Sequence, residues 1–121
     1  MNPNELKKRT KRFALNIILL VENLPKTRIT EVIGRQLLRS GTSVGANYRS
    51  ACSARSIAEF IAKMGIVEEE LDETLYWIEL LIESGILLPN RAEEIIREAK
   101  ELLAISVASI KTAKRNKKGS A

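Results

Sequence analysis

A run of carboxylates in the middle of the chain is the first feature that suggests chemistry. Glu68, Glu69, Glu70, Asp72 and Glu73 lie almost consecutively, and carboxylates on helices are the usual ligands of paired metal ions. Helical di-metal sites of that design also need a Glu-x-x-His motif on two of their helices. The chain has no histidine, which excludes this design, zinc-finger and metalloprotease patterns, and any histidine-based triad. We therefore expect no metal and no cofactor.

Ser43 and Lys63 are the remaining pair to consider as a nucleophile and its base. The run Gly41-Thr42-Ser43-Val44-Gly45 has too few glycines for a phosphate-binding loop, and it lacks the preceding strand and the lysine of such a loop. It does not form a nucleophile elbow either. We expect that the protein is not an enzyme.

Basic residues near both ends of the chain are the better candidates for binding a ligand. The net charge is +5. In an antiparallel bundle of four helices, the first helix starts and the last helix ends at the same pole, so the two basic clusters are expected to form one positive end. Such an end attracts nucleic acid or another polyanion, and the alternative is that basic termini only aid solubility. The candidate nucleic-acid-binding residues are Lys7, Lys8, Arg9, Lys11, Arg12, Lys111, Lys114, Arg115, Lys117 and Lys118.

The elements that position these residues are predicted to be helices. Apolar residues make up 45% of the chain, aromatic residues 4%, and there are three prolines, as expected of an aliphatic helical core. Apolar residues recurring every three or four positions predict a first helix over about 4–24, ended by Pro25, and a second over about 27–52.

Glycines make the second helix the least obvious element. Gly34, Gly41 and Gly45 each cost roughly 1 kcal/mol relative to alanine in a helix interior, which leaves a loop through residues 40–43 as an alternative. One apolar face nevertheless continues through all three glycines. The periodicity therefore favours an unbroken helix whose glycines let a neighbouring helix approach closely.

Capping signals mark the third helix. Ser56 and Glu59 are spaced as a capping box, and Gly85 follows Ser84 where a left-handed residue would end the helix. Its predicted core face comprises Phe60, Met64, Val67, Leu71, Leu75, Ile78 and Ile82.

A fourth helix is predicted from Asn90, as N-cap, with Glu93 completing a second capping box. Residues 114–121 are polar and lack apolar periodicity, so they are expected to be a disordered basic tail. Short connections make each helix antiparallel to the one before it. The predicted fold class is therefore all-α: an antiparallel up-down-up-down four-helix bundle domain over residues 1–113.

Apolar residues away from the predicted core faces indicate self-association. A tryptophan and two large aliphatic residues fall together on the outward face of the third helix, and the first helix adds two leucines. Scattered apolar residues are also normal on a monomer's surface, which is the alternative. The predicted oligomer interface comprises Leu15, Leu19, Ile66, Trp77 and Leu81.

A polar stripe along the second helix faces the charged residues of the third. Such a network would set the helix register or the orientation of a partner. A second interpretation has Arg35, Arg39 and Arg49 contacting phosphates. The predicted polar network comprises Gln36, Arg39, Ser43, Asn47, Glu59, Lys63, Glu70 and Glu73.

The N-terminal segment resembles the start of a signal peptide only superficially. Its apolar run over residues 13–21 is interrupted by Asn16, and no small-residue cleavage site follows. It is also shorter than the roughly 20 residues that cross a bilayer. Cys52 is the single cysteine, which rules out an intrachain disulfide. We expect a cytoplasmic protein with no membrane contact.

Residues 36–49, with the sequence QLLRSGTSVGANYR, resemble the signature of a bacterial four-helix bundle family. That family includes proteins encoded by intervening sequences in 23S ribosomal RNA genes. Residues 59–63, 69–77 and 104–114 extend the resemblance, which covers about residues 6–114. The resemblance implies a ring-like homopentamer. It also points to a related branch, the accessory variability determinants of diversity-generating retroelements, which are basic pentameric barrels that bind nucleic acid and a reverse transcriptase.

Two functions are compatible with these features. The first is a homo-oligomeric module that binds RNA or DNA through the basic pole without reading bases. The second is a structural scaffold for a protein partner, with no role in nucleic-acid binding.

Overall fold

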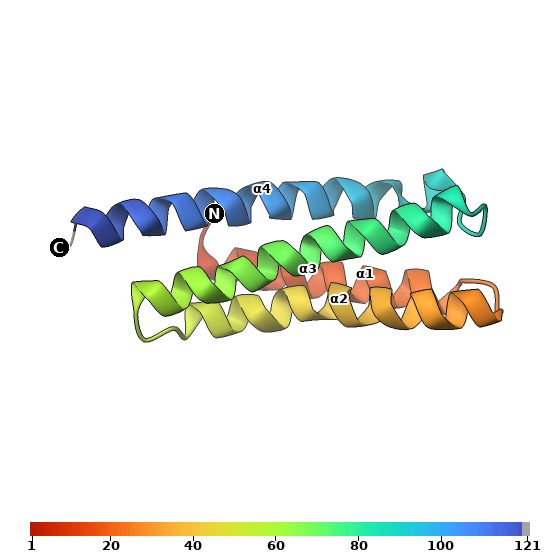
Figure 1. Ribbon diagram of the computed structural model, residues 1–121, viewed down its shortest axis with the longest axis horizontal. Helices are drawn as coiled ribbons and strands as arrows, with labels where there is room; N and C mark the ends of the chain where they lie inside the picture. Colours follow the sequence, from red (N-terminus) through yellow and green to blue (C-terminus); the bar gives the residue numbers. More distant parts are fainter. Residues whose placement is uncertain (120–121) are drawn as a thin grey trace.

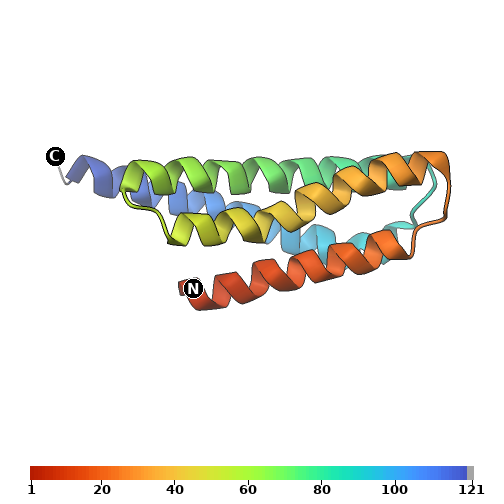
Figure 2. The ribbon, with the colours of Figure 1, turned by 90° about the horizontal axis from the view of Figure 1, so that it is seen from below.

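The computed structural model describes residues 1–119, and four helices account for nearly all of them. They are α1 (Pro3–Glu22), α2 (Arg28–Cys52), α3 (Ile57–Glu83) and α4 (Pro89–Gly119). Each helix packs against the next one in the chain, and α4 returns to contact α1. Figure 1 and Figure 2 show their alternating directions. The predicted all-α fold and four-helix bundle are confirmed.

Side-chain caps start both α2 and α3. Thr27 and Thr30 form a reciprocal capping box at the start of α2. The Ser56 hydroxyl accepts a hydrogen bond from the backbone N–H of Glu59 at the start of α3. The Glu59 carboxylate does not complete the predicted box, because it accepts instead from the backbone N–H of Arg55 at 3.2 Å. The cap therefore provides acceptors for the backbone N–H groups of Glu59 and Arg55, whereas the predicted capping box would pair those of Glu59 and Ser56.

Helix ends account for two corrections around α4. Gly85 has a φ of 79°, as predicted for the residue that ends α3. The predicted N-cap Asn90 is wrong, because α4 begins one residue earlier at Pro89, whose fixed φ suits the first helical position. The structure continues α4 through residues 114–119, where a disordered tail was expected. Lysine and arginine are good helix formers and stabilise the last turn, while residues 120–121 lie outside the described part.

The core is aliphatic, as the composition indicates. It runs the length of the bundle and takes side chains from all four helices. Its largest fully buried side chains are Phe13, Ile17, Leu37, Val44, Met64, Leu71, Ile78, Leu81 and Leu102.

The α3 core face differs from the predicted one, and the difference removes Leu81 from the predicted oligomer interface. Leu81 is 0% exposed and lies in the core. The buried positions of α3 alternate in steps of three and four through Thr74 and Leu81, a 3.5-residue repeat typical of helices that coil around one another. The prediction instead followed Leu75 and Ile82, which are only partly buried. It passed over position 74 because threonine is polar.

The α2 glycines lie inside an unbroken helix, as the periodicity predicts. A Cβ atom at Gly41 would lie 2.8 Å from two side-chain carbons of Ile17, which is too close for either atom. One at Gly45 would lie 3.3 Å from the Thr10 hydroxyl oxygen. The two glycines therefore allow α1 and α2 to pack with their backbones close together.

We predict that Gly41→Ala destabilises the protein by about 1–3 kcal/mol despite alanine's higher helix propensity, because the added methyl group overlaps Ile17. Gly65→Ala is the matched control. A Cβ there meets nothing within 4 Å, so the control should gain up to about 1 kcal/mol. Urea unfolding followed by circular dichroism measures both. Equal stabilisation by the two substitutions would show that α1 and α2 do not pack closely at Gly41.

Candidate functional site

The start of α1 and the end of α4 lie at the same end of the bundle (Figure 1). This is the end where α2 passes into α3, and α4 extends beyond it (Figure 1). Both basic clusters therefore belong to one pole. We refer to this end, with its two clusters, as the basic pole.

Arg9 is the member of this pole whose charge is already balanced. Its guanidinium donates to both carboxylate oxygens of Glu98, at 2.5 and 2.9 Å, and lies 3.1 Å from Glu101. The hydrogen bonds to Glu98, opposed by burial, raise the pKa of Arg9. Arg9 was predicted to contact nucleic acid, but the structure places it in an ion-paired contact between α1 and α4. Spacing along the sequence gives no sign of this pairing, because Glu98 is distant in the chain.

The nine other basic side chains of the pole form no ion pair within residues 1–119. Five of them line two separate hollows. Lys7 and Lys11 line a shallow groove between α1 and α2, which Arg49 also lines. Lys114 and Lys117, with Lys118, line a hollow against the first turns of α3. The groove is lined by α1 and α2 alone and the hollow by α3 and α4 alone, so the two sets of lysines lie on different parts of the pole.

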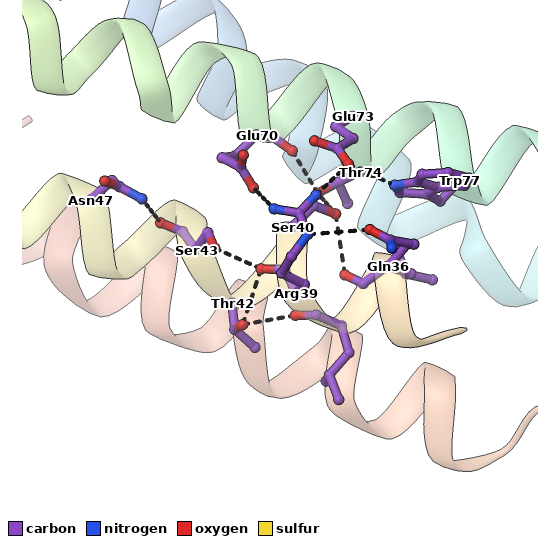
Figure 3. A network of polar contacts seen from close by, with 12 residues as sticks. Gln36, Arg39, Ser40, Thr42, Ser43, Asn47, Glu70, Glu73, Thr74 and Trp77 are labelled. Carbon is purple, nitrogen blue, oxygen red and sulfur yellow. Dashed lines mark hydrogen bonds and ion pairs between the residues drawn. The ribbon is translucent and has the colours of Figure 1, made fainter. Parts of the chain in front are cut away.

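Arg39 is the centre of the polar network between α2 and α3 (Figure 3). Its guanidinium donates to Glu70 at 3.0 Å, to Gln36 at 3.2 Å, and to Glu73. Glu73 also accepts from the Trp77 indole N–H at 3.2 Å. The network therefore joins two helices through one arginine that bridges two carboxylates.

A buried hydrogen bond lies beside this network, and the sequence analysis missed it. The Thr74 hydroxyl donates to the Ser40 hydroxyl at 2.9 Å, and both side chains are fully buried. The available signal was that Thr74 follows Glu70 by one helical turn and therefore shares its side of α3. This pair favours one register of α2 against α3, because sliding either helix breaks the hydrogen bond between them. Each hydroxyl also lies within reach of a carbonyl of its own helix, Leu37 for Ser40 and Glu70 for Thr74, so the loss is that of one hydrogen bond.

Four residues of the predicted network do not join it. Ser43 donates to the carbonyl of Arg39, and Asn47 to the carbonyl of Ser43, both within α2. Glu59 caps the start of α3. Lys63 forms no ion pair in the described chain. Helical spacing predicts the direction in which each of these side chains points. It does not predict its position along the bundle axis, which decides whether a partner on the other helix lies within reach.

The Arg39 ion pairs shift two pKa values in opposite directions. The hydrogen bond to Glu73, opposed by burial, raises the pKa of Arg39. The hydrogen bond from Arg39 lowers the pKa of Glu73, against the opposing effect of burial, and the Trp77 N–H lowers it further. The folded state therefore favours the ionised Glu73 carboxylate.

The predicted interface residues occupy different environments. Leu15 and Leu19 are more than half exposed on α1, at 52% and 60%, and Ile66 is exposed on α3. Trp77 is half-buried and hydrogen-bonded to Glu73. The sequence analysis missed further exposed apolar residues on α2, among them Ile29 and Val32. Surface leucine, isoleucine and valine at these positions form no part of this bundle's core.

Two absences concern the described residues. Residues 1–119 hold no group of three or more cysteine, aspartate or glutamate side chains placed to bind a metal ion. In the same range, no helix is both long and apolar enough to span a bilayer.

Comparison with known proteins relates the chain to one family and to solved structures. Residues 3–108 match the family model described as 23S rRNA-intervening sequence protein. The chain is also similar to a crystal structure of a protein of unknown function from the S23 ribosomal protein family of Bacteroides thetaiotaomicron, at 38% sequence identity and a TM-score of 0.81. That similarity covers 87% of this chain and 97% of the other. No curated protein matches the chain.

We predict an acid transition in the fluorescence of Trp77, the only tryptophan, because its N–H is bound to Glu73. Since the folded-state pKa of Glu73 lies below its ordinary value of 4.5, its stabilising contribution is complete above that value. The contribution is lost as the pH falls through the lowered folded pKa. Arg39→Met should move the midpoint to higher pH, and Glu73→Gln should remove the transition.

Glu69→Gln is the control for this titration, because Glu69 is exposed on the same helix and has no ion-pair partner among the described residues. It should leave the midpoint unchanged. A midpoint that Arg39→Met does not move would show that Arg39 does not hold the Glu73 carboxylate in solution.

Proposed function

This chain belongs to the 23S rRNA-intervening sequence protein family, and from that membership we propose that it is a non-enzymatic, homo-oligomeric module that binds nucleic acid through its basic pole. The observation that carries the proposal is the set of nine basic side chains at one end of the bundle without carboxylate partners in the described chain. Uncompensated charge of one sign creates a potential that attracts polyanions.

The residue types at the pole favour phosphate contacts over base recognition. Eight of the nine side chains are exposed to solvent on α1 and α4, and seven of the nine are lysines, which act as point charges. Base readout needs side chains aimed at base edges from an element that fits a groove. A scattered set of lysines instead releases counterions from the backbone, so affinity depends strongly on salt.

Self-association is supported by the apolar residues left on the surface of α1 and α2. Leu15, Leu19, Ile29 and Val32 each keep more than half of their surface exposed. Burying such residues in a subunit contact removes apolar surface from water. The resemblance of the sequence to pentameric relatives, including the accessory variability determinants of diversity-generating retroelements, supports five copies in a ring and the same nucleic-acid role.

We expect the purified protein to bind fragments of 23S ribosomal RNA with an affinity that falls steeply as salt rises. Between 50 and 200 mM salt, six or more phosphate contacts would lower the affinity by about a thousandfold. Fluorescence anisotropy with labelled RNA measures this, and an unrelated duplex DNA tests selectivity.

An absence of binding at low salt would overturn this proposal. The remaining interpretation would then be a scaffold for a protein partner, and the cytoplasmic location expected from the sequence suits either role.

We expect light scattering to show an oligomer whose mass falls in the double variant Leu15→Lys, Leu19→Lys. Both leucines are exposed in the single chain, so the charges should not disturb its fold, but a buried lysine pair would oppose association. Ile57→Lys, at another exposed apolar residue, is the control and should keep the mass. An unchanged mass in the double variant would remove these leucines from the interface.

A further inference from the structure

The groove between α1 and α2 at the basic pole is lined by three cations from two helices. Lys7 and Lys11 lie one turn apart on α1, and Arg49 faces them from the last turn of α2. We propose that this groove binds the phosphodiester backbone of one nucleic-acid strand and is the main contact surface of the pole. This inference rests on the proposed nucleic-acid binding and specifies where it occurs.

The floor of the groove is shallow because small residues let the two helices pack closely. Ala14 on α1 and Ala46 on α2 line it together with Gly45. A Cβ at Gly45 would lie only 3.3 Å from the Thr10 hydroxyl oxygen, so a larger side chain there would press on Thr10. Its volume is about 200 Å³, below the roughly 300 Å³ at which small-molecule pockets begin. The groove suits an extended anionic chain lying along it.

Charge in the groove is uncompensated, which separates it from other basic residues of the protein. None of its lining residues is acidic. In contrast, Arg9 is held by Glu98, Arg35 lies 3.5 Å from Glu31, and Arg39 bridges Glu70 and Glu73. Of the three arginines first considered as phosphate contacts on α2, only Arg49 has no carboxylate partner in the described chain. The tertiary structure then places it with two lysines from α1.

The hydroxyls lining the groove are already used by the helices. Thr10 donates to the carbonyl of Leu6, and Thr42 donates to the carbonyl of Leu38. The lysines and the arginine are therefore the donors that remain for a ligand. Lysine and arginine are the usual donors to phosphate oxygens of a nucleic-acid backbone.

The lysines at the end of α4 have a structural explanation that the groove lysines lack. Lys117 and Lys118 lie in the last turn of α4, where positive charge offsets the negative end of the helix dipole. Lys7 and Lys11 lie instead in the N-terminal half of α1, where the helix dipole provides no such stabilisation. Binding of an anionic ligand in the groove would explain why two lysines lie one turn apart in this half of α1.

The test compares two triple variants that remove the same charge. Lys7→Gln, Lys11→Gln, Arg49→Gln should lower the affinity for the 23S ribosomal RNA fragment by about tenfold or more at 0.1 M salt. The slope of log affinity against log salt should fall by about two to three, one contact for each lost cation. Lys114→Gln, Lys117→Gln, Lys118→Gln should change both quantities less.

A charge-preserving variant, Lys7→Arg, Lys11→Arg, Arg49→Lys, should bind like the parent protein, which separates lost charge from damaged structure. If the half-buried Lys7 disturbs folding when replaced, the exposed pair Lys11→Gln, Arg49→Gln should still lower the slope by about two. If the α4 variant loses more RNA affinity than the groove variant, or if the groove variant binds RNA like the parent protein, the groove is not the main contact surface. Either result would leave the proposed nucleic-acid binding itself intact. A parent protein that binds no RNA would overturn both.

Discussion

Close packing of α1 against α2 is the constraint on which the other features of this bundle depend. Gly41 leaves space that Ile17 fills completely, and Gly45 brings Thr10 against the α2 backbone. Where the two helices approach this closely, small residues such as Ala14, Gly45 and Ala46 lie along the contact, which we call the seam. The longer side chains of Lys7, Lys11 and Arg49 line the same groove. The same seam thus buries core side chains on its inner side and forms the cation-lined groove on its outer side.

The α2–α3 pair is specified by polar contacts instead. An aliphatic core tolerates sliding, because one leucine replaces another at little cost in free energy. The Ser40–Thr74 hydrogen bond and the ion pairs of Arg39 with Glu70 and Glu73 join the two helices at the observed register, and sliding either helix would break them. We interpret this cluster as a set of contacts that selects one register of α2 against α3. Its ion pairs are partly exposed, and such pairs add little to the free energy of unfolding.

Ion pairs across helix boundaries are formed by two arginines of the bundle. Arg9 and Arg39 each pair with two carboxylates of a neighbouring helix. The remaining lysines and arginines near the pole have no such partner in the described chain, and the antiparallel topology gathers them from both ends of the sequence. Uncompensated charge of one sign at this end creates the field that the proposed binding of a polyanion requires.

Apolar periodicity, capping residues and short connections were enough to predict four helices, their order and the unbroken α2, because these depend on residues near one another in the chain. The position of each side chain along the bundle axis, and the residue that it contacts on another helix, were not predictable in this way. Leu81 belongs to the core because α3 follows a 3.5-residue repeat set by its neighbours, and Arg9 pairs with Glu98 because α4 returns to α1. A helical stripe gives the direction in which a side chain points. Which residue it meets depends on the register and rotation of a second helix, and only the packed structure defines these.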